Sequence, residues 1–426
     1  MGNRMVQAKR LAPYSRRALL GGLGLGAASA FASRAGPPAR RVAAAATPVA
    51  SPVADVGADA VIALVDAAMA RYHLKAAIAR VLIDGHELVT IARGETMNGV
   101  PATPEMHFRN GAVAISYVST ALLVLVDRGV VGLDDSLATW LPDLPDADTT
   151  TLRMLANMTA GYPDYVNTDQ FAAENDADPF RRWSPEDLIA VSLAQGRAFA
   201  PGENWAYSHS DYVILGLALE RIAGTPLDLL LRELVLDPLG LVNTASFATP
   251  QIPEPVLHAF TSERRAALGI PAGTRFYEES TFWDPSWTLA RGAIQTTTVA
   301  DMAASAVAIG EGTLLSPGSH RAQTEKALAG FGSALPGCVT CRAMTSAVSY
   351  GLGLWLVGDW LLQNPSFGGY GAFMAYLPAR RIALAVAVTV AEDGFDDRGN
   401  FLTPNAAQPI GSAIGGLLAP ESPFGG

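Results

Sequence analysis

Lysine is nearly absent from this 426-residue chain, which contains only Lys9, Lys75 and Lys326. A serine activated by lysine occupies an S-x-x-K motif, but Tyr72 and Gln323 stand three residues before Lys75 and Lys326. No serine follows a glycine by two positions, so the G-x-S-x-G turn that exposes a nucleophilic serine is also missing. The sequence therefore excludes both of these arrangements for nucleophilic catalysis.

The residue patterns of metal and phosphate sites are missing as well. The six histidines form no H-E-x-x-H motif, no cluster of metal ligands is visible, and there is no G-x-x-x-x-G-K-[ST] loop. We therefore expect neither a metal nor a cofactor.

Long apolar runs are missing after the N-terminal region, where none reaches the roughly 18 residues of a membrane span. Residues 1–46 contain eight Lys or Arg and no acid, and Ser15-Arg16-Arg17 precedes a soft apolar stretch interrupted by glycine. This pattern is similar to a twin-arginine export signal, and residues 47–56 have the composition of a flexible linker. We therefore predict export to the periplasm, the cell surface or the medium.

Acidic residues dominate the rest of the chain. Removing the eight N-terminal positive charges from the 30 basic residues leaves 22 against 40 acidic ones, a net charge of −18. Such a surface repels nucleic acid and anionic lipid, so neither is an expected partner. The remaining residues are numerous and apolar enough to bury a large core in one domain or two subdomains.

Only two cysteines are present, in the sequence Cys338-Val339-Thr340-Cys341. A metal site needs a second pair of ligands, and a thioredoxin-like motif opens a helix, whereas the preceding Pro336-Gly337 predicts a loop. In an exported protein this pair is expected to close a small structural disulfide.

The stretch from Ala112 to Val126 is apolar on every face of a helical wheel. Such a helix lies inside a domain, and its 15 residues, at about 1.5 Å each, are too few to cross a bilayer. We predict a central buried helix that is entered through Arg109-Asn110-Gly111 and ends at Gly129. The start of this helix suits a nucleophile, because its free N–H groups and dipole favour negative charge.

Strand patterns occur toward both ends of the chain. Residues 56–72 have the spacing of an amphipathic helix, and two strands around Asp84-Gly85 have a hairpin turn between them. Residues 381–390 alternate large and small side chains, which predicts a strand whose small face lies under a helix. Residues 350–355 and 372–376 are predicted to form further strands.

This order predicts an α+β fold, with an antiparallel sheet flanked by helices and an inserted helical subdomain. We place one domain at residues 57–426. Its α/β part covers about 57–110 and 290–420, and its helical part covers about 110–290.

Several motifs resemble those of the serine β-lactamase and penicillin-binding-protein family, on its class C β-lactamase, D-Ala-D-Ala carboxypeptidase and esterase side. Residues 108–111 are similar to the start of the family's F-R-x-G-S-x-x-K motif, and residues 152–165 to its I-R-x-L-L-x-H-T-S-G-L-P-D-Y segment. Residues 199–216 are similar to F-x-P-G-x-x-F-x-Y-S-N-x-x-Y-x-x-L-G. The resemblance covers most of residues 105–390. It implies the same fold and a small-molecule, peptide or cell-wall-derived ligand.

The resemblance also indicates which reactive groups this chain has lost. The family's serine nucleophile falls on Ala112, and its lysine base falls on Ile115. Loss of a nucleophile or its base typically lowers the rate by on the order of 10⁴ to 10⁶. The backbone N–H of Ala112 is still expected to point into the cleft as an oxyanion donor.

The other two active-site motifs survive in part. The proton-relay tyrosine of Y-x-N is Tyr207, and the asparagine is replaced by His209. The third motif, on the strand that lines the cleft, is mapped onto Phe367 and the Gly368-Gly369 pair. The predicted cleft therefore consists of Ala112, Ile115, Tyr207, Ser208, His209, Phe367, Gly368 and Gly369.

Three hypotheses follow, and the first is a ligand-binding member without catalysis. The second is a hydrolase of the esterase, peptidase or β-lactamase type that uses a substitute nucleophile, Ser116 or Ser208, with Tyr207 and His209. It requires a serine Oγ within about 3.2 Å of His209 or Tyr207, whereas a serine in a buried helix more often bonds a preceding carbonyl.

The third hypothesis is a structural or interaction protein whose cleft is filled by large side chains. The candidates for this filling are Ile115, Met158, Tyr162 and Phe367. The oligomeric state is not predicted.

Overall fold

An amphipathic helix and a long hairpin open the part of the chain that the structure describes. The computed structural model describes residues 57–247, 249–289 and 295–424, so the predicted signal (1–46) and linker (47–56) lie outside the described residues. Helix α1 (Ala58–Arg71) is followed by β1 (Leu74–Ile83) and β2 (His86–Met97). Asp84 and Gly85 join the strands with φ values of 51° and 76°, as a type I′ turn requires. Both predictions are confirmed.

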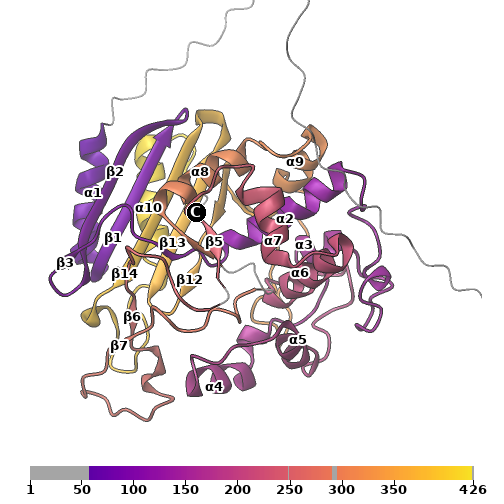
Figure 1. Ribbon diagram of the computed structural model, residues 1–426, viewed down its shortest axis with the longest axis horizontal. Helices are drawn as coiled ribbons and strands as arrows, with labels where there is room; N and C mark the ends of the chain where they lie inside the picture. The colour runs from indigo at the N-terminus through magenta and orange to yellow at the C-terminus, as the bar shows by residue number, and fades with distance from the viewer. Residues whose placement is uncertain (1–56, 248, 290–294, 425–426) are drawn as a thin grey trace, which may run out of the picture. The chain divides into compact units, whose positions relative to one another are not determined.

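The main sheet combines these strands with strands from the C-terminal third of the chain (Figure 1). Its order is β3-β2-β1-β14-β13-β11-β10-β9, with β12 beside β13, and the paired strands are antiparallel. The other strands are β3 (Val100–Pro101), β9 (Val348–Tyr350), β10 (Trp355–Val357), β11 (Trp360–Gln363), β12 (Ser366–Phe367), β13 (Tyr370–Leu377) and β14 (Ile382–Val390). This antiparallel sheet with its helices confirms the predicted fold class.

Helices cover both faces of the sheet. In β13, Phe373 and Tyr376 are three residues apart and therefore point to opposite faces. Gly411 of α10 (Ala407–Leu418) lies against the ring of Phe373, and Gly310 of α8 (Val299–Gly310) lies against the ring of Tyr376. Helix α1 contacts α10 and therefore shares its face.

The alternation predicted for β14 has a structural cause. Ala383 of β14 pairs with Tyr376, and the residues of such a pair project from the same face. The small face of β14 therefore lies under α8, as predicted.

The prediction of one strand over residues 350–355 is wrong. These residues join β9 to β10 through a turn in which the Gly351 N–H donates to the Leu354 carbonyl at 2.9 Å. Gly353 has a φ of 76°, which is outside the strand region and favours glycine. The glycines therefore mark the end of one strand and the start of the next.

The central helix is α2 (Val113–Asp127), and every side chain from Val113 to Leu125 is buried. Gly129 follows it with a φ of 68°, so the predicted helix and its end are confirmed. Helices α6 and α7 pack against α2. The helices between α2 and the late strands are α3 (Leu152–Ala156), α4 (Asp169–Ala177), α5 (Pro185–Leu193), α6 (His209–Ala223) and α7 (Leu227–Leu231).

Small strands and one further helix complete the described fold. The order β4-β8-β5 forms a three-stranded sheet, and β6 pairs with β7. The bounds are β4 (Phe108–Arg109), β5 (Ala245–Ser246), β6 (Phe260–Thr261), β7 (Glu278–Glu279), β8 (Gln295–Thr297) and α9 (Pro317–Thr324). Among the described residues, no helix has the length and apolar character needed to span a membrane.

Candidate functional site

The floor of the site is the first turn of α2, formed by Gly111, Ala112 and Ile115. Strand β4 leads into this turn, where the Asn110 N–H donates to the Gln295 carbonyl at 3.1 Å. The first intrahelical bond then runs from Val113 N–H to the Asn110 carbonyl at 3.0 Å. Within the described part of the chain, no hydrogen bond uses the Ala112 N–H. This amide is one of the free donors that every helix start leaves.

The wall of the site, Tyr207 and His209, lies at the start of α6. The two residues on either side of His209 bond the chain beside it: Ser208 Oγ donates to the Tyr162 carbonyl at 2.9 Å, and Ser210 Oγ to the Pro163 carbonyl at 2.6 Å. His209 Nδ1 lies 3.0 Å from Asp164 Oδ2 and 3.2 Å from Oδ1. Three successive residues of one segment are thus joined to residues 162–164 of another.

Asp164 is held in place from both sides. Its side chain is only 4% exposed, and its Oδ1 accepts the Val166 N–H at 3.2 Å. Asn167 Nδ2 donates to its Oδ2 at 3.3 Å. A carboxylate accepts hydrogen bonds, so Nδ1 of His209 carries the proton, and the imidazole orientation is fixed.

Tyr207 completes the polar part of the wall. Its hydroxyl has no hydrogen-bond partner among the described residues, and its ring lies 5.3 Å from the His209 ring, nearly perpendicular to it. Burial raises the pKa of Tyr207 above its usual range, and the charge of Asp164 raises it further. The hydroxyl therefore remains protonated at neutral pH and can donate a hydrogen bond.

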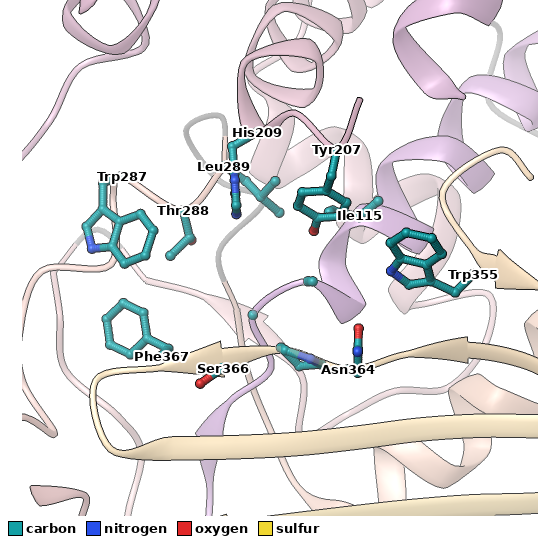
Figure 2. A pocket seen from close by; sticks show the side chains of 13 residues that line it. Ile115, Tyr207, His209, Trp287, Thr288, Leu289, Trp355, Asn364, Ser366 and Phe367 are labelled. Atoms are coloured by element: carbon teal, nitrogen blue, oxygen red, sulfur yellow. The ribbon is translucent and has the colours of Figure 1, made fainter. Parts of the chain in front are cut away.

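Five aromatic rings form an unbroken arc around the site (Figure 2). Successive ring centroids are 5.6, 6.3, 5.3 and 6.1 Å apart along the series Phe367, Trp287, His209, Tyr207 and Trp355. The rings come from strands β12 and β10, the start of α6 and the loop before β8. They provide a large apolar surface with few polar atoms.

The floor, the wall and the arc enclose a cavity of about 270 Å³. Thr288 and Leu289 also line it, as does the segment Asn364–Phe367, which ends in β12. Pro365 lies so close to Gly111 that a Cβ on this glycine would meet the proline Cβ at 2.5 Å. The segment beside the start of α2 is therefore Asn364-Pro365.

The mapping of the third motif onto residues 367–369 needs correction. Gly368 and Gly369, with φ values of 36° and 87°, form the two-residue turn between β12 and β13, because Phe367 pairs with Tyr370. Gly369 packs against the Phe260 backbone, and neither glycine lines the cavity. Only Phe367 of the three predicted residues belongs to the site.

The prediction that Ser208 lines the cleft is wrong, and neither substitute serine has the required geometry. Ser208 is buried, and its Oγ, besides its bond to Tyr162, accepts the Asp211 N–H at 3.2 Å as the cap of α6. Ser116 Oγ donates to the Val113 carbonyl at 2.5 Å and is also buried. Neither residue lines the cavity or bonds to His209 or Tyr207.

A filled cleft is not what the structure contains. Met158 and Tyr162 are buried in the core away from the cavity, and Ile115 and Phe367 border the cavity without filling it. The Cys338–Cys341 disulfide is present, in a loop that reaches Ala206 next to the wall.

Several lining residues were not predicted: Trp287, Thr288, Leu289, Trp355, Asn364, Pro365 and Ser366. They come from loops and strands that the sequence separates widely, and no local pattern marks them. Asp164 was missed as the partner of His209, although it lies within the segment that carries the second family resemblance. No group of three or more His, Cys, Asp or Glu in the described ranges can hold a metal ion.

The fold is hydrolase-like, with a cavity at the start of its buried central helix. The family model described as Beta-lactamase matches residues 61–407, so the chain belongs to the beta-lactamase family. The predicted family is thereby confirmed.

Individual relatives match shorter stretches. Penicillin-binding protein 4* of Bacillus subtilis is 26% identical over 153 residues, which cover 35% of this chain and 33% of that protein. Esterase EstB of Burkholderia gladioli is 28% identical over 244 residues, or 52% of this chain and 62% of that protein. The chain thus matches less than two thirds of the length of either relative.

Solved structures share the fold over most of the chain. The D-amino acid amidase of Ochrobactrum anthropi, complexed with L-phenylalanine, has a TM-score of 0.69 at 22% identity, covering 85% of this chain and 99% of that one. The D-stereospecific amidohydrolase of Streptomyces has a TM-score of 0.68 at 21% identity, covering 85% and 98%. At these identities the likeness establishes the fold alone.

Proposed function

We propose that this protein is an exported, ligand-binding member of the beta-lactamase family that has lost acyl-enzyme catalysis. The observation that carries the proposal is the floor of the cavity, where Ala112 and Ile115 offer neither a nucleophile nor a base. Ile115 is 0% exposed and belongs to the hydrophobic core. An open cavity beside these two residues supports binding without covalent chemistry.

The relatives give the proposal its chemical setting. They include penicillin-binding proteins, an esterase and D-alanyl-D-alanine carboxypeptidases, and the structural neighbours include amidases. We infer that the ligand is a small molecule, a peptide or a cell-wall-derived compound containing an acyl group. The Ala112 N–H, which no described residue bonds, supports this inference, because it can donate to a carbonyl oxygen.

Covalent labelling tests the loss of catalysis. The natural protein is incubated with a fluorescent penicillin and with a fluorophosphonate, and its intact mass is measured. We expect no adduct, whereas the double variant Ala112→Ser, Ile115→Lys is expected to be labelled at residue 112. An adduct on a serine of the natural protein, for example Ser366 in the cavity lining, would overturn the proposal whether or not the double variant folds.

Export is the second part of the proposal and has its own test. The basic residues of positions 1–46, with Arg16-Arg17 before an apolar stretch, support a twin-arginine signal. The double change Arg16→Lys, Arg17→Lys is expected to leave the protein in the cytoplasm, since this pathway reads the arginine pair. Fractionation and immunoblotting of both forms measure the effect, and export of the variant at the normal level would argue against this signal.

A further inference from the structure

His209 is held as an oriented base. Its neighbours Ser208 and Ser210 bond successive carbonyls of residues 162–163, and its own Nδ1 bonds Asp164. The side chain of His209 is 21% exposed, and His209 lines the cavity. With Nδ1–H directed at the carboxylate, Nε2 carries the lone pair, and no described residue bonds it. Such a pair resembles the base and orienting acid of hydrolases that use histidine.

Two hydrogen-bond donors open into the same cavity. The N–H of Ala112 has no partner in the described ranges and lies at the start of α2, where the helix dipole adds positive potential. The Tyr207 hydroxyl also has no partner among the described residues, and Figure 2 shows it pointing into the cavity. The cavity therefore combines a base with donors for a developing oxyanion, which are the two groups that direct hydrolysis requires.

We propose that the His209–Asp164 pair activates a water molecule for direct hydrolysis of esters, without an acyl-enzyme. Nε2 removes a proton from water while the water oxygen forms a bond to the ester carbonyl carbon. The carbonyl electron pair moves to its oxygen, which accepts hydrogen bonds from Ala112 N–H and the Tyr207 hydroxyl. Collapse of this intermediate breaks the bond to the leaving alcohol oxygen, which takes the proton from Nε2. The products are one carboxylic acid and one alcohol.

The lining indicates the class of ester. The aromatic arc favours an apolar or aromatic group, and no Lys or Arg lines the cavity among the described residues. A substrate carboxylate would therefore find no cation among the described lining residues, and the Asp164 charge behind His209 would repel it. The expected substrate is a small uncharged ester with a good leaving group. This activity goes beyond the proposed function, since it adds turnover to binding.

A matched pair elsewhere in the protein provides the control. His258 Nδ1 lies 2.6 Å from Glu279 Oε1, but neither residue lines the cavity around Ala112. Any protein imidazole can hydrolyse an activated ester slowly, so this pair measures the background. A change at His258 removes one histidine–carboxylate pair without touching the cavity.

The test uses p-nitrophenyl butyrate and the full-length protein, with initial rates measured across the pH range 5–9. We expect turnover without a burst and a rate that rises with pH, as general-base activation of water requires. His209→Asn is expected to lower the rate on the order of 10²-fold or more and to abolish the pH dependence. Asp164→Asn keeps a capping side chain and is expected to lower the rate and displace the pH profile, while His258→Asn leaves both unchanged.

Three results would overturn the inference. The first is a His209→Asn variant that hydrolyses the ester as fast as the natural protein does. The second is a His258→Asn variant whose hydrolysis rate falls as much as that of His209→Asn. The third is a burst with an acyl adduct in the intact mass. An adduct on a serine would overturn the proposed function as well, whereas an unchanged rate in His209→Asn would leave the proposed binding function intact.

Discussion

The floor and the wall of the cavity have diverged in different ways from the family pattern. At the floor, the positions that the resemblance assigns to the serine and the lysine hold Ala112 and Ile115, and Ile115 is part of the core. At the wall, Tyr207 is kept, and His209 replaces one polar residue by another that bonds Asp164. The proposed function therefore leaves the floor with only a backbone donor, whereas the wall holds a polar network.

This difference follows from the energetics of the two places. An apolar side chain at the start of a buried helix adds to a core that already exists, so loss of the serine and lysine costs the fold nothing. At the wall, the side chains of Ser208, His209 and Ser210 each bond a residue of the segment 162–164. Removing one of these side chains leaves its buried partner without a hydrogen bond. Replacing a nucleophile at the floor therefore costs less folding stability than removing the polar contacts that orient the residues of the wall.

The largest expected effect is at the floor. Ile115→Ala removes buried methyl and methylene groups, so we expect the free energy of unfolding to fall by about 2–5 kcal/mol. Ile115→Val is expected to lower it by about 0.5–1.5 kcal/mol, and Ala112→Ser, at the edge of the cavity, by less than about 0.5 kcal/mol. Urea unfolding measures all three. A loss below 1 kcal/mol for Ile115→Ala would mean that the floor does not contribute to the core as described.

Sequence reasoning predicted the floor better than the wall, for physical reasons. The run from Ala112 to Val126 is long and apolar, so it predicts a buried helix without knowledge of its neighbours. The arc depends on packing among distant segments, and nothing local in the sequence places Trp287 or Trp355 beside Tyr207.

The errors at Ser208 and at residues 368–369 have local causes. Ser208 is followed three positions later by Asp211, a spacing typical of a helix start, and this signal predicts the cap that the structure contains. Two adjacent glycines before an apolar strand are equally typical of a hairpin turn. In both cases, turn and capping chemistry predicts the local structure better than the family resemblance does.

The wall also depends on the disulfide loop behind it. Asn204 Nδ2 donates to the Ser333 carbonyl at 3.1 Å, and its Oδ1 accepts the Ser333 N–H at 2.7 Å. Arg342 lies 4.4 Å from the centre of the Trp355 ring, which stacks on Tyr207. The cysteines are only three positions apart, so the Cys338→Ser, Cys341→Ser change is expected to lower the free energy of unfolding by about 2 kcal/mol.

Reduction provides the matched experiment for the disulfide. Val339, between the cysteines, is 81% exposed, so dithiothreitol can reach the loop. We expect dithiothreitol to lower the unfolding midpoint of the natural protein to that of the double variant and to leave the variant unchanged. An equal response of both proteins to dithiothreitol would show that the disulfide does not support the wall.

The smallest expected effect concerns Asp211, a fully buried carboxyl beneath the wall. Burial raises its pKa well above the usual range, and Asp164 raises it further, against the opposite effect of Arg197. Because the folded-state pKa is above the unfolded value, the folded protein binds the proton more tightly. Stability is therefore lost as pH rises from the unfolded pKa, about 3.9, through the raised folded value.

Asp211→Asn removes this ionisation while keeping the size of the side chain. We expect the variant to be more stable than the natural protein by about 1 kcal/mol at high pH, with the difference disappearing as the pH falls toward 4. Thermal unfolding at several pH values measures this. A variant that is less stable at high pH would mean that the Asp211 charge is compensated by Arg197, and the wall would then rest on a buried ion pair instead of a neutral carboxyl.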